Sequence, residues 1–434
     1  MSCLQLGAFA PVTGTWAPLP VPDRVFSRRL SPTRGSCHQS GWRLPLCPAA
    51  AAACCARAAA RGHSSRKRLG KHARRVLQPY AIEPINSYLA EMKLTVQRLA
   101  ERGSGLLDAS QTPEELEGLL KKAGAKGSEE GRRAWRELLC ATEGLGRFCS
   151  CVVFEDEALR QSASDGRTFV DILQEQDVIV GVRVDTGYYP LNAYGEKGTD
   201  GYADLNARCL EYYRCGVRLA KWRLQVLCTM EMPTDVAVWE NTTRLAQAAR
   251  ACQANGLAFA GEIEVVMGPG NHSMERTAYV AEKVYSQAMR MMNEYDVTLE
   301  AAVLITGACA AGPEAGPVRQ DDAAEFTVRC LRRTAPLALG GVHISPSEDS
   351  NPEMAARNVR AVQEASVGAP WVPMPVYTQS LLAPVLAAWV REDDSKELWD
   401  ASARSTLVRL LEASSQSQVG MSEEDTLPPG KEGA

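Results

Sequence analysis

The feature that most constrains the fold of this chain is a regular alternation of short apolar runs with helical patterns. Eight apolar runs follow one another, and their starts lie roughly 30 to 45 residues apart, which leaves room for one helix and its loops. We expect these runs to be strands: Gly105–Ala109, Cys149–Phe154, Val178–Asp185, Leu219–Arg223, Ala258–Val266, Leu299–Gly307, Leu337–Ile344 and Trp371–Tyr377.

Helical patterns occupy the intervals, and the first opens with Thr112 before Pro-Glu-Glu, which is typical of a helix N-terminus. Alternating strands and helices predict an α/β protein, a single closed (β/α)8 TIM barrel with flanking N- and C-terminal helices. An open doubly wound sheet is the competing arrangement. The predicted helices are Thr112–Ala123, Glu129–Ala141, Tyr202–Cys215, Val236–Asn255, Glu275–Tyr295, Asp321–Thr334 and Asn351–Ala365, with Ile85–Arg102 and Lys396–Ser414 as the flanking pair.

The two ends of the chain differ from this middle in composition. Residues 1–82 hold 13 Lys or Arg residues against one acid, Asp23, and are rich in Ala and Ser. This composition predicts an organelle transit peptide, with a basic nucleic-acid-binding arm as the alternative. Because no basic residue precedes Asp23, a plastid presequence fits better than a mitochondrial one. We therefore expect a transit peptide at 1–82, the barrel at 83–415 and a disordered acidic tail at 416–434.

Several classes of function are disfavoured by the remaining composition. From residue 83 onward 35 basic residues face 51 acidic ones, a balance that repels nucleic acid. The chain has no apolar run of 18 residues, so we expect no membrane span. Cys149 and Cys151 alternate along a predicted strand, which favours buried free thiols over metal ligands.

A set of motifs in a fixed order resembles the class I fructose-bisphosphate aldolases over residues 84–414. The resemblance implies a TIM barrel that cleaves fructose 1,6-bisphosphate reversibly into dihydroxyacetone phosphate and glyceraldehyde 3-phosphate, in glycolysis or the Calvin cycle. It also implies a Schiff base on a lysine and no cofactor. The motifs are Gly181-Val182-Arg183-Val184-Asp185-Thr186-Gly187, Ala220-Lys221-Trp222-Arg223, Glu262-Ile263-Glu264, Thr298-Leu299-Glu300, Cys330-Leu331-Arg332-Arg333-Thr334 and Pro370-Trp371.

The resemblance carries five active-site positions over to this chain: Asp185, Lys221, Arg223, Glu262 and Glu264. Strands project alternate residues to one side, so Lys221 and Arg223 can share the barrel interior with the two glutamates of the next strand. Two cations facing two carboxylates fit a general acid/base relay. They fit a mutually neutralised polar plug equally well, because unpaired buried charges are costly.

Other family positions have changed. Ile305 aligns with the Schiff-base lysine, and a hydrocarbon side chain cannot attack a carbonyl. Arg183 replaces a lysine; it keeps the positive charge for a substrate anion but cannot lose its proton. Ser110 aligns with the family aspartate at the end of the first strand. We therefore expect a catalytically impaired member of the family, a pseudoenzyme.

The two phosphate grips of the family are altered as well. Pro346-Ser347 aligns with a Ser-Gly pair whose backbone cradles a phosphate, and proline removes an N–H donor. The motif Val376-Tyr377-Thr378-Gln379 replaces Ser-Tyr-Gly-Arg and loses a phosphate-binding arginine. The usual C-terminal tyrosine is missing.

Two alternatives remain open from the sequence. In the first, Lys221 serves as a relocated Schiff-base lysine with Glu262 or Glu264 as acid/base. This role requires that neighbouring arginines lower the pKa of Lys221, whereas ion pairing to the glutamates would raise it. A metal-dependent aldolase is disfavoured, because only His272 and His343 follow the presequence. In the second, the barrel is a scaffold or regulator that forms homo- or hetero-oligomers with aldolase subunits.

Overall fold

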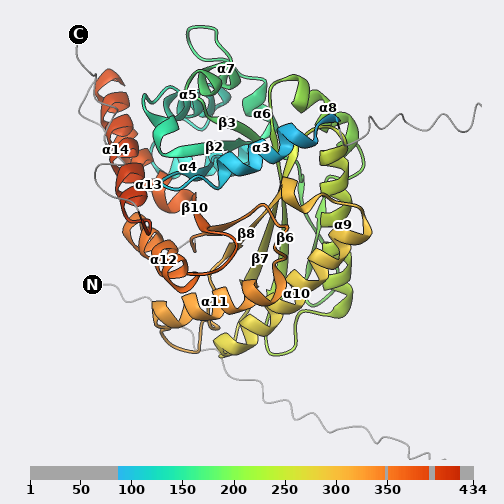
Figure 1. Ribbon diagram of the computed structural model, residues 1–434. Helices are drawn as coiled ribbons and strands as arrows, with labels where there is room; N and C mark the ends of the chain where they lie inside the picture. Colours follow the sequence, from blue (N-terminus) through green and yellow to red (C-terminus); the bar gives the residue numbers. More distant parts are fainter. Residues whose placement is uncertain (1–86, 348–349, 391–395, 421–434) are drawn as a thin grey trace, which may run out of the picture. The chain divides into compact units, whose positions relative to one another are not determined.

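The computed structural model describes residues 87–347, 350–390 and 396–420 (Figure 1). The predicted transit peptide at 1–82 and residues 421–434 of the predicted tail lie outside the described residues. The predicted boundary at 415 falls inside the last helix, α14 (Lys396–Gln416), and the Gln418 that follows is buried. The described chain thus continues past that boundary as part of the folded unit.

Eight parallel strands close into a barrel, which confirms the predicted architecture and excludes the open sheet. Hydrogen-bonded neighbours around the barrel run in the order β1-β10-β9-β8-β7-β6-β3-β2, so that β1 closes the ring between β10 and β2. The barrel strands are β1 (Gly105–Asp108), β2 (Cys149–Phe154), β3 (Ile179–Arg183), β6 (Leu219–Cys228), β7 (Ala258–Met267), β8 (Ala302–Gly307), β9 (Gly341–Ser345) and β10 (Pro373–Tyr377).

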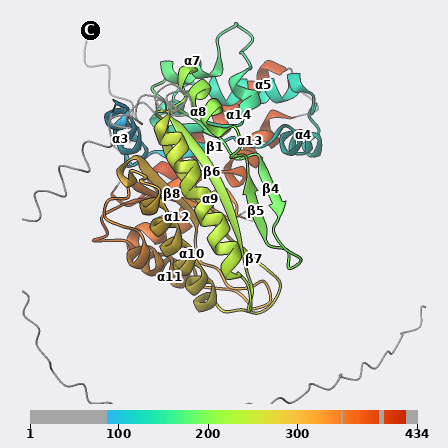
Figure 2. The same cartoon turned by 90° about the vertical axis from the view of Figure 1, so that its right-hand side faces the viewer.

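Helices cover the outside of the barrel, and α9 lies along β6 and β7 (Figure 2). The predicted helices are present, with ends shifted by up to a few residues. They are α3 (Leu89–Leu99), α4 (Pro113–Lys122), α5 (Glu129–Cys140), α8 (Leu205–Arg214), α9 (Asp235–Ala254), α10 (Met274–Glu294), α11 (Gln320–Thr334) and α12 (Pro352–Ala365). None of the described helices is both long and apolar enough to cross a bilayer.

Some elements escape the sequence pattern. The eighth barrel helix, α13 (Gln379–Trp389), is apolar on nearly every side and contains Pro384, so it shows no amphipathic period. Packing between β10 and α14 explains that composition. A small antiparallel hairpin, β4 (Gly187–Pro190) with β5 (Lys197–Asp200), projects beside β6 (Figure 2). Two short helices, α6 (Asp156–Leu159) and α7 (Phe169–Glu175), were also not predicted.

Two predicted strands begin later than expected. Residues Leu299–Ala301 form a 3-10 turn, so β8 begins at Ala302. Leu337 is 84% exposed in the loop before β9, which begins at Gly341. In both places the apolar run begins in the loop that precedes the strand, and hydrophobicity alone cannot locate the boundary between loop and strand.

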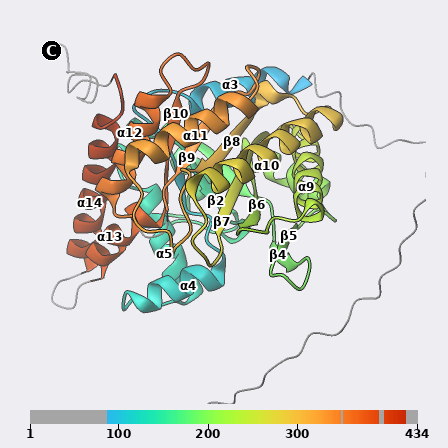
Figure 3. The same cartoon turned by 90° about the horizontal axis from the view of Figure 1, so that it is seen from below.

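The barrel has an apolar interior that α3 closes at the N-terminal end of the strands. Met92, Val96 and Leu99 of α3 pack with inward-facing strand residues such as Val303. His343 Nε2, from β9, donates a hydrogen bond to the carbonyl of Leu99 at 3.2 Å, which ties α3 to the strands. Helices α9 to α12 form a continuous part of the outer wall (Figure 3). Polar groups can therefore gather only at the opposite, C-terminal end of the strands, where TIM barrels carry their active sites.

Candidate functional site

Six charged side chains meet at the C-terminal ends of β1 and β3 and, at the same level, within the longer strands β6 and β7. This ion-pair cluster consists of Asp108, Arg183, Asp185, Lys221, Arg223 and Glu262. Inward and outward residues alternate along each strand, and on β6 Leu219 lies in the apolar interior two residues before Lys221. The cluster thus forms the layer directly above the hydrophobic core of the barrel.

Lys221 is the centre of the cluster and is 1% exposed. Its Nζ donates a hydrogen bond to Oδ2 of Asp108 and lies 2.8 Å from Oε2 of Glu262. Burial acts to lower the pKa of Lys221, but the adjacent Asp108 and Glu262 carboxylates more than offset it, so the pKa lies above its ordinary value. The ammonium form is therefore stabilised, and a free amine is disfavoured near neutral pH.

Asp108 is the member of the ion-pair cluster that was not predicted from the sequence. Ser110 was predicted to align with the family aspartate, and Asp108 lies two residues earlier, as the last residue of β1. The Ser110 hydroxyl donates to Oδ1 of Asp108 at 2.5 Å. Burial opposes ionisation of Asp108, yet the charge of Lys221 and the hydrogen bonds lower its pKa from 3.8 to about 2. The signal available in the sequence was an acid in an otherwise apolar strand.

Asp185 organises the arginine half of the cluster. Its side chain is fully buried; Oδ1 lies 2.9 Å from Nη2 of Arg223 and 3.9 Å from Nε of Arg183. The backbone N–H of Arg223 also donates to Oδ2 of Asp185 at 3.2 Å. Burial acts against the charge of Arg223, but Asp185 raises its pKa. Both arginines are therefore held as permanent cations.

Arg183 is directed toward the loop after β1. Its Nη1 donates to the carbonyl of Ser110 at 2.6 Å and lies 3.8 Å from Oε2 of Glu115 on α4. The side chain is 3% exposed. The charge at this predicted anion-binding position is thus directed at the protein itself, and its contacts join β3 to the first barrel helix.

Glu264 lies above the cluster, near the end of β7. It is exposed and accepts a hydrogen bond from Nε2 of Gln225 at 2.7 Å. The Arg223 guanidinium lies over the aromatic ring of Tyr188 of β4, 5.4 Å from the ring centroid. Burial raises the pKa of the Tyr188 hydroxyl. We expected two cations to face two glutamates on the neighbouring strand. The structure shows this contact for Lys221 and Glu262, whereas Arg223 is paired with Asp185.

Ile305 extends the apolar interior up to the level of the charges. It is the register partner of Glu262 on β7 and of His343 on β9. Its side chain is 0% exposed and packs in the inner cluster with Val303 and Val376. At the position aligned with the Schiff-base lysine, the barrel is therefore filled with hydrocarbon.

The positions aligned with the phosphate grips are built differently from a phosphate cradle. Ser347 Oγ lies 2.7 Å from Oγ of Ser350, so the hydroxyl after Pro346 is used within its own loop. Gln379 is the first residue of α13, and Tyr377 belongs to the outer hydrophobic core. No arginine stands at the start of this helix to bind an anion.

Charge balance determines what the cluster can do chemically. Three cations, Arg183, Lys221 and Arg223, oppose three carboxylates, and Asp108 supplies the third negative charge. Each group has an oppositely charged partner within the cluster, so a proton relay among them would have to break an ion pair at every step. Among the described residues no group of three or more His, Cys, Asp or Glu side chains is arranged to hold a metal ion.

Comparisons with known proteins identify the family of the chain. Residues 91–430 match the family model described as fructose-bisphosphate aldolase class-I. A fructose-bisphosphate aldolase from Dictyostelium discoideum is 34% identical over 343 residues, covering 77% of this chain and 94% of that protein. The cytosolic fructose-bisphosphate aldolase 5 of Arabidopsis thaliana is 32% identical over 337 residues, covering 77% and 92%.

A solved structure gives the same result for the fold. It is the fructose-bisphosphate aldolase of Plasmodium falciparum in complex with TRAP and a small-molecule inhibitor, and it superposes with a TM-score of 0.71 at 33% identity. The match covers 76% of this chain and 94% of that one. With its closed barrel and these matches over nearly the whole length of its relatives, the chain belongs to the class I fructose-bisphosphate aldolase family.

Proposed function

We propose that this protein is an aldolase-family barrel that has lost the Schiff-base cleavage of fructose 1,6-bisphosphate and acts as a scaffold or regulatory subunit. The observation that carries the proposal is Ile305, which is fully buried among apolar side chains where the family resemblance requires an amine. Without that amine the ketone of the substrate has no nucleophile, and the family's carbon–carbon cleavage cannot begin.

The neutralised cluster supports the same proposal. A catalytic site in this family would need one group free to exchange protons with substrate, whereas Lys221 is shared between Asp108 and Glu262. The cluster fits a role in stability: it satisfies the charges that cap the hydrophobic core of the barrel. The alternative, a lyase that uses Lys221 as a relocated Schiff-base lysine, would require the amine to lose its proton beside two carboxylates.

An aldolase assay of the protein tests this proposal directly. We expect no cleavage of fructose 1,6-bisphosphate by the wild-type chain, and none by Ile305→Lys, because the phosphate positions at Pro346 and Gln379 are changed as well. Ile305→Met is the matched control for a long side chain without an amine. Turnover by the wild type would overturn the proposal. Turnover by Ile305→Lys alone would contradict the expectation that the changes at Pro346 and Gln379 also prevent cleavage.

A second experiment separates a scaffold from a regulator that senses a metabolite. For a scaffold, we expect the tagged protein to form a complex with a purified active aldolase in size-exclusion chromatography with light scattering. Calorimetric titration with fructose 1,6-bisphosphate should then give no heat of binding. Binding of the sugar without complex formation would favour the sensor, and the absence of both would exclude this pair of roles.

Residues 1–82 support the further proposal that the barrel works in the plastid stroma, with the mitochondrion as the alternative. The support is compositional: arginine, alanine and serine are abundant and Asp23 is the single acid. Fusion of residues 1–82 to a fluorescent protein tests this proposal. Fluorescence that stays in the cytosol of plant cells would contradict it.

A further inference from the structure

Two buried cysteines from different helices lie side by side in the outer layer of the barrel. Cys209 of α8 and Cys252 in the last turn of α9 have their Sγ atoms 3.6 Å apart. Both residues are 0% exposed and belong to the outer hydrophobic core. Because the sulfur atoms of a disulfide lie about 2.05 Å apart, the two Sγ atoms have to approach each other by about 1.5 Å to form the bond.

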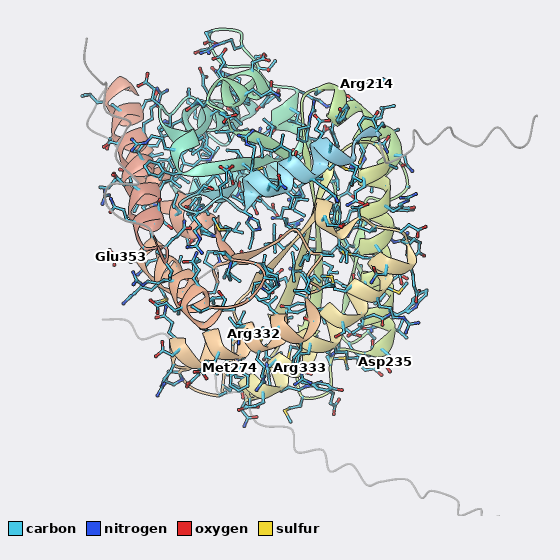
Figure 4. The ribbon with its side chains drawn as sticks, viewed as in Figure 1. Arg214, Asp235, Met274, Arg332, Arg333 and Glu353 are labelled. Atoms are coloured by element: carbon cyan, nitrogen blue, oxygen red, sulfur yellow. The ribbon has the colours of Figure 1, made fainter. Side chains whose placement is uncertain are left out.

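The course of the two helices agrees with this contact. Figure 4 labels Arg214, the last residue of α8, and Asp235, the first residue of α9, at opposite ends of the same side of the molecule. It is therefore the C-terminal turn of α9, which carries Cys252, that lies beside α8 (Figure 1). The pair joins two neighbouring helices across a packed interface and stands apart from the ion-pair cluster.

We propose that Cys209 and Cys252 are a redox modification site, at which hydrogen peroxide converts the two thiols into an intramolecular disulfide. A thiolate of the pair attacks one peroxide oxygen, the O–O bond breaks, and hydroxide leaves and takes up a proton to become water. The sulfenic acid that results is attacked by the second sulfur, which forms the S–S bond and displaces a second water. Two electrons pass from the two sulfurs to the peroxide, so the step is balanced.

Burial slows the oxidation of the two thiols, and the closeness of the second sulfur favours the disulfide as the product. Burial and the adjacent Cys209 raise the pKa of the Cys252 thiol, so little thiolate exists while the interface is closed. The proposal therefore requires a local opening of α8 through which a small oxidant reaches the pair. This helix is short, and its N-cap residue Asp204 makes no side-chain cap hydrogen bond. Once one sulfur is oxidised, the second lies within reach, and over-oxidation is suppressed.

The disulfide would fix a helix that supports the loop of the ion-pair cluster. Arg208, next to Cys209, donates to the carbonyl of Val184 at 2.9 Å and to the carbonyl of Gly201. Val184 directly precedes Asp185. Anchoring α8 to α9 closes a loop of the intervening chain and so restricts the unfolded state. We therefore expect the oxidised protein to be the more stable form, with a Tm higher by on the order of 5 °C.

Peptide mapping of the full-length protein tests the proposal. The reduced protein is treated with hydrogen peroxide, its remaining thiols are blocked with N-ethylmaleimide, and it is then denatured and digested without reductant. The expected product is one cross-linked peptide pair containing Cys209 and Cys252, lighter by two hydrogen atoms than its separate halves. Thermal unfolding should show the rise in Tm, and dithiothreitol should reverse both changes.

Cys215 provides the matched control, because it follows the same helix and is exposed. Cys215→Ser should leave the cross-link and the rise in Tm intact, whereas Cys209→Ala and Cys252→Ala should each abolish both. If either alanine variant fails to fold, the wild-type peptide map decides alone. Sulfinic acid on either cysteine without a cross-link, or a cross-link that uses Cys215, would overturn the proposal.

Discussion

Glu262 and Ile305 are register partners on adjacent strands, β7 and β8. The carboxylate that neutralises Lys221 thus stands beside a hydrocarbon side chain at the position of the family's nucleophile. The boundary between the charged layer and the apolar interior of the barrel passes between these two residues. On one side of this boundary Glu262 is paired with Lys221, and on the other side Ile305 packs among apolar side chains.

Lys221→Met should destabilise the protein by about 3–5 kcal/mol, because it leaves the buried Asp108 and Glu262 carboxylates without their shared cation. The double variant Lys221→Met with Asp108→Asn should recover part of that loss, since one uncompensated charge is removed. Chemical denaturation of the wild type, both single variants and the double variant gives the coupling energy. Purely additive effects would show that the pair is not energetically linked.

Lys221 should not form a Schiff base. Because its carboxylate neighbours raise its pKa, the amine is protonated at neutral pH and cannot attack a ketone. We expect no covalent adduct on Lys221 after incubation with dihydroxyacetone phosphate and borohydride, as followed by mass spectrometry. A second arm at pH 10, where an ordinary lysine with a pKa of about 10.4 is partly deprotonated, should give adducts on exposed lysines before Lys221. An adduct on Lys221 at neutral pH would revive the relocated-lysine mechanism.

His343 should make the folded state sensitive to mild acid. Burial lowers its pKa from 6.5 to about 4, so the unfolded chain binds a proton that the folded chain refuses. Stability contributed by the neutral ring is thus present above pH 6.5 and is lost as the pH falls toward 4. The loss is on the order of 3 kcal/mol. In His343→Gln the free energy of unfolding by urea should change less with pH across this window. An unchanged dependence on pH would contradict the assignment to His343.

Asp108 should act in a lower window. Its folded pKa of about 2 lies below the ordinary 3.8, so its ionised form stabilises the fold above about pH 4. That contribution, roughly 2 kcal/mol, is lost as the pH falls from 4 to 2. Asp108→Asn should be less stable than the wild type at pH 7 and should lose less stability in this acid range. Denaturant midpoints at pH 5, 4 and 3 provide the comparison.

Parts of the fold were predictable because they depend on local periodicity. The runs that became β2 and β7 were placed closely, since each is bounded by helical patterns. Helix α13 was missed because its exposed positions, such as Ala383 and Ala387, are also apolar, which removes the amphipathic period. The starts of β8 and β9 were misplaced because apolar residues such as Leu337 continue into the preceding loops.

The sequence by itself determined the repeating strand–helix pattern and the hydrocarbon side chain of Ile305 in β8, because both are properties of residue type and order. Tertiary structure alone decided which charges pair. Asp108 and Lys221 are 113 residues apart, and only closure of the barrel brings β1 and β6 to the same mouth. The same holds for Cys209 and Cys252, whose contact depends on how α8 packs against α9. Such contacts depend on distances in space, which residue order does not specify.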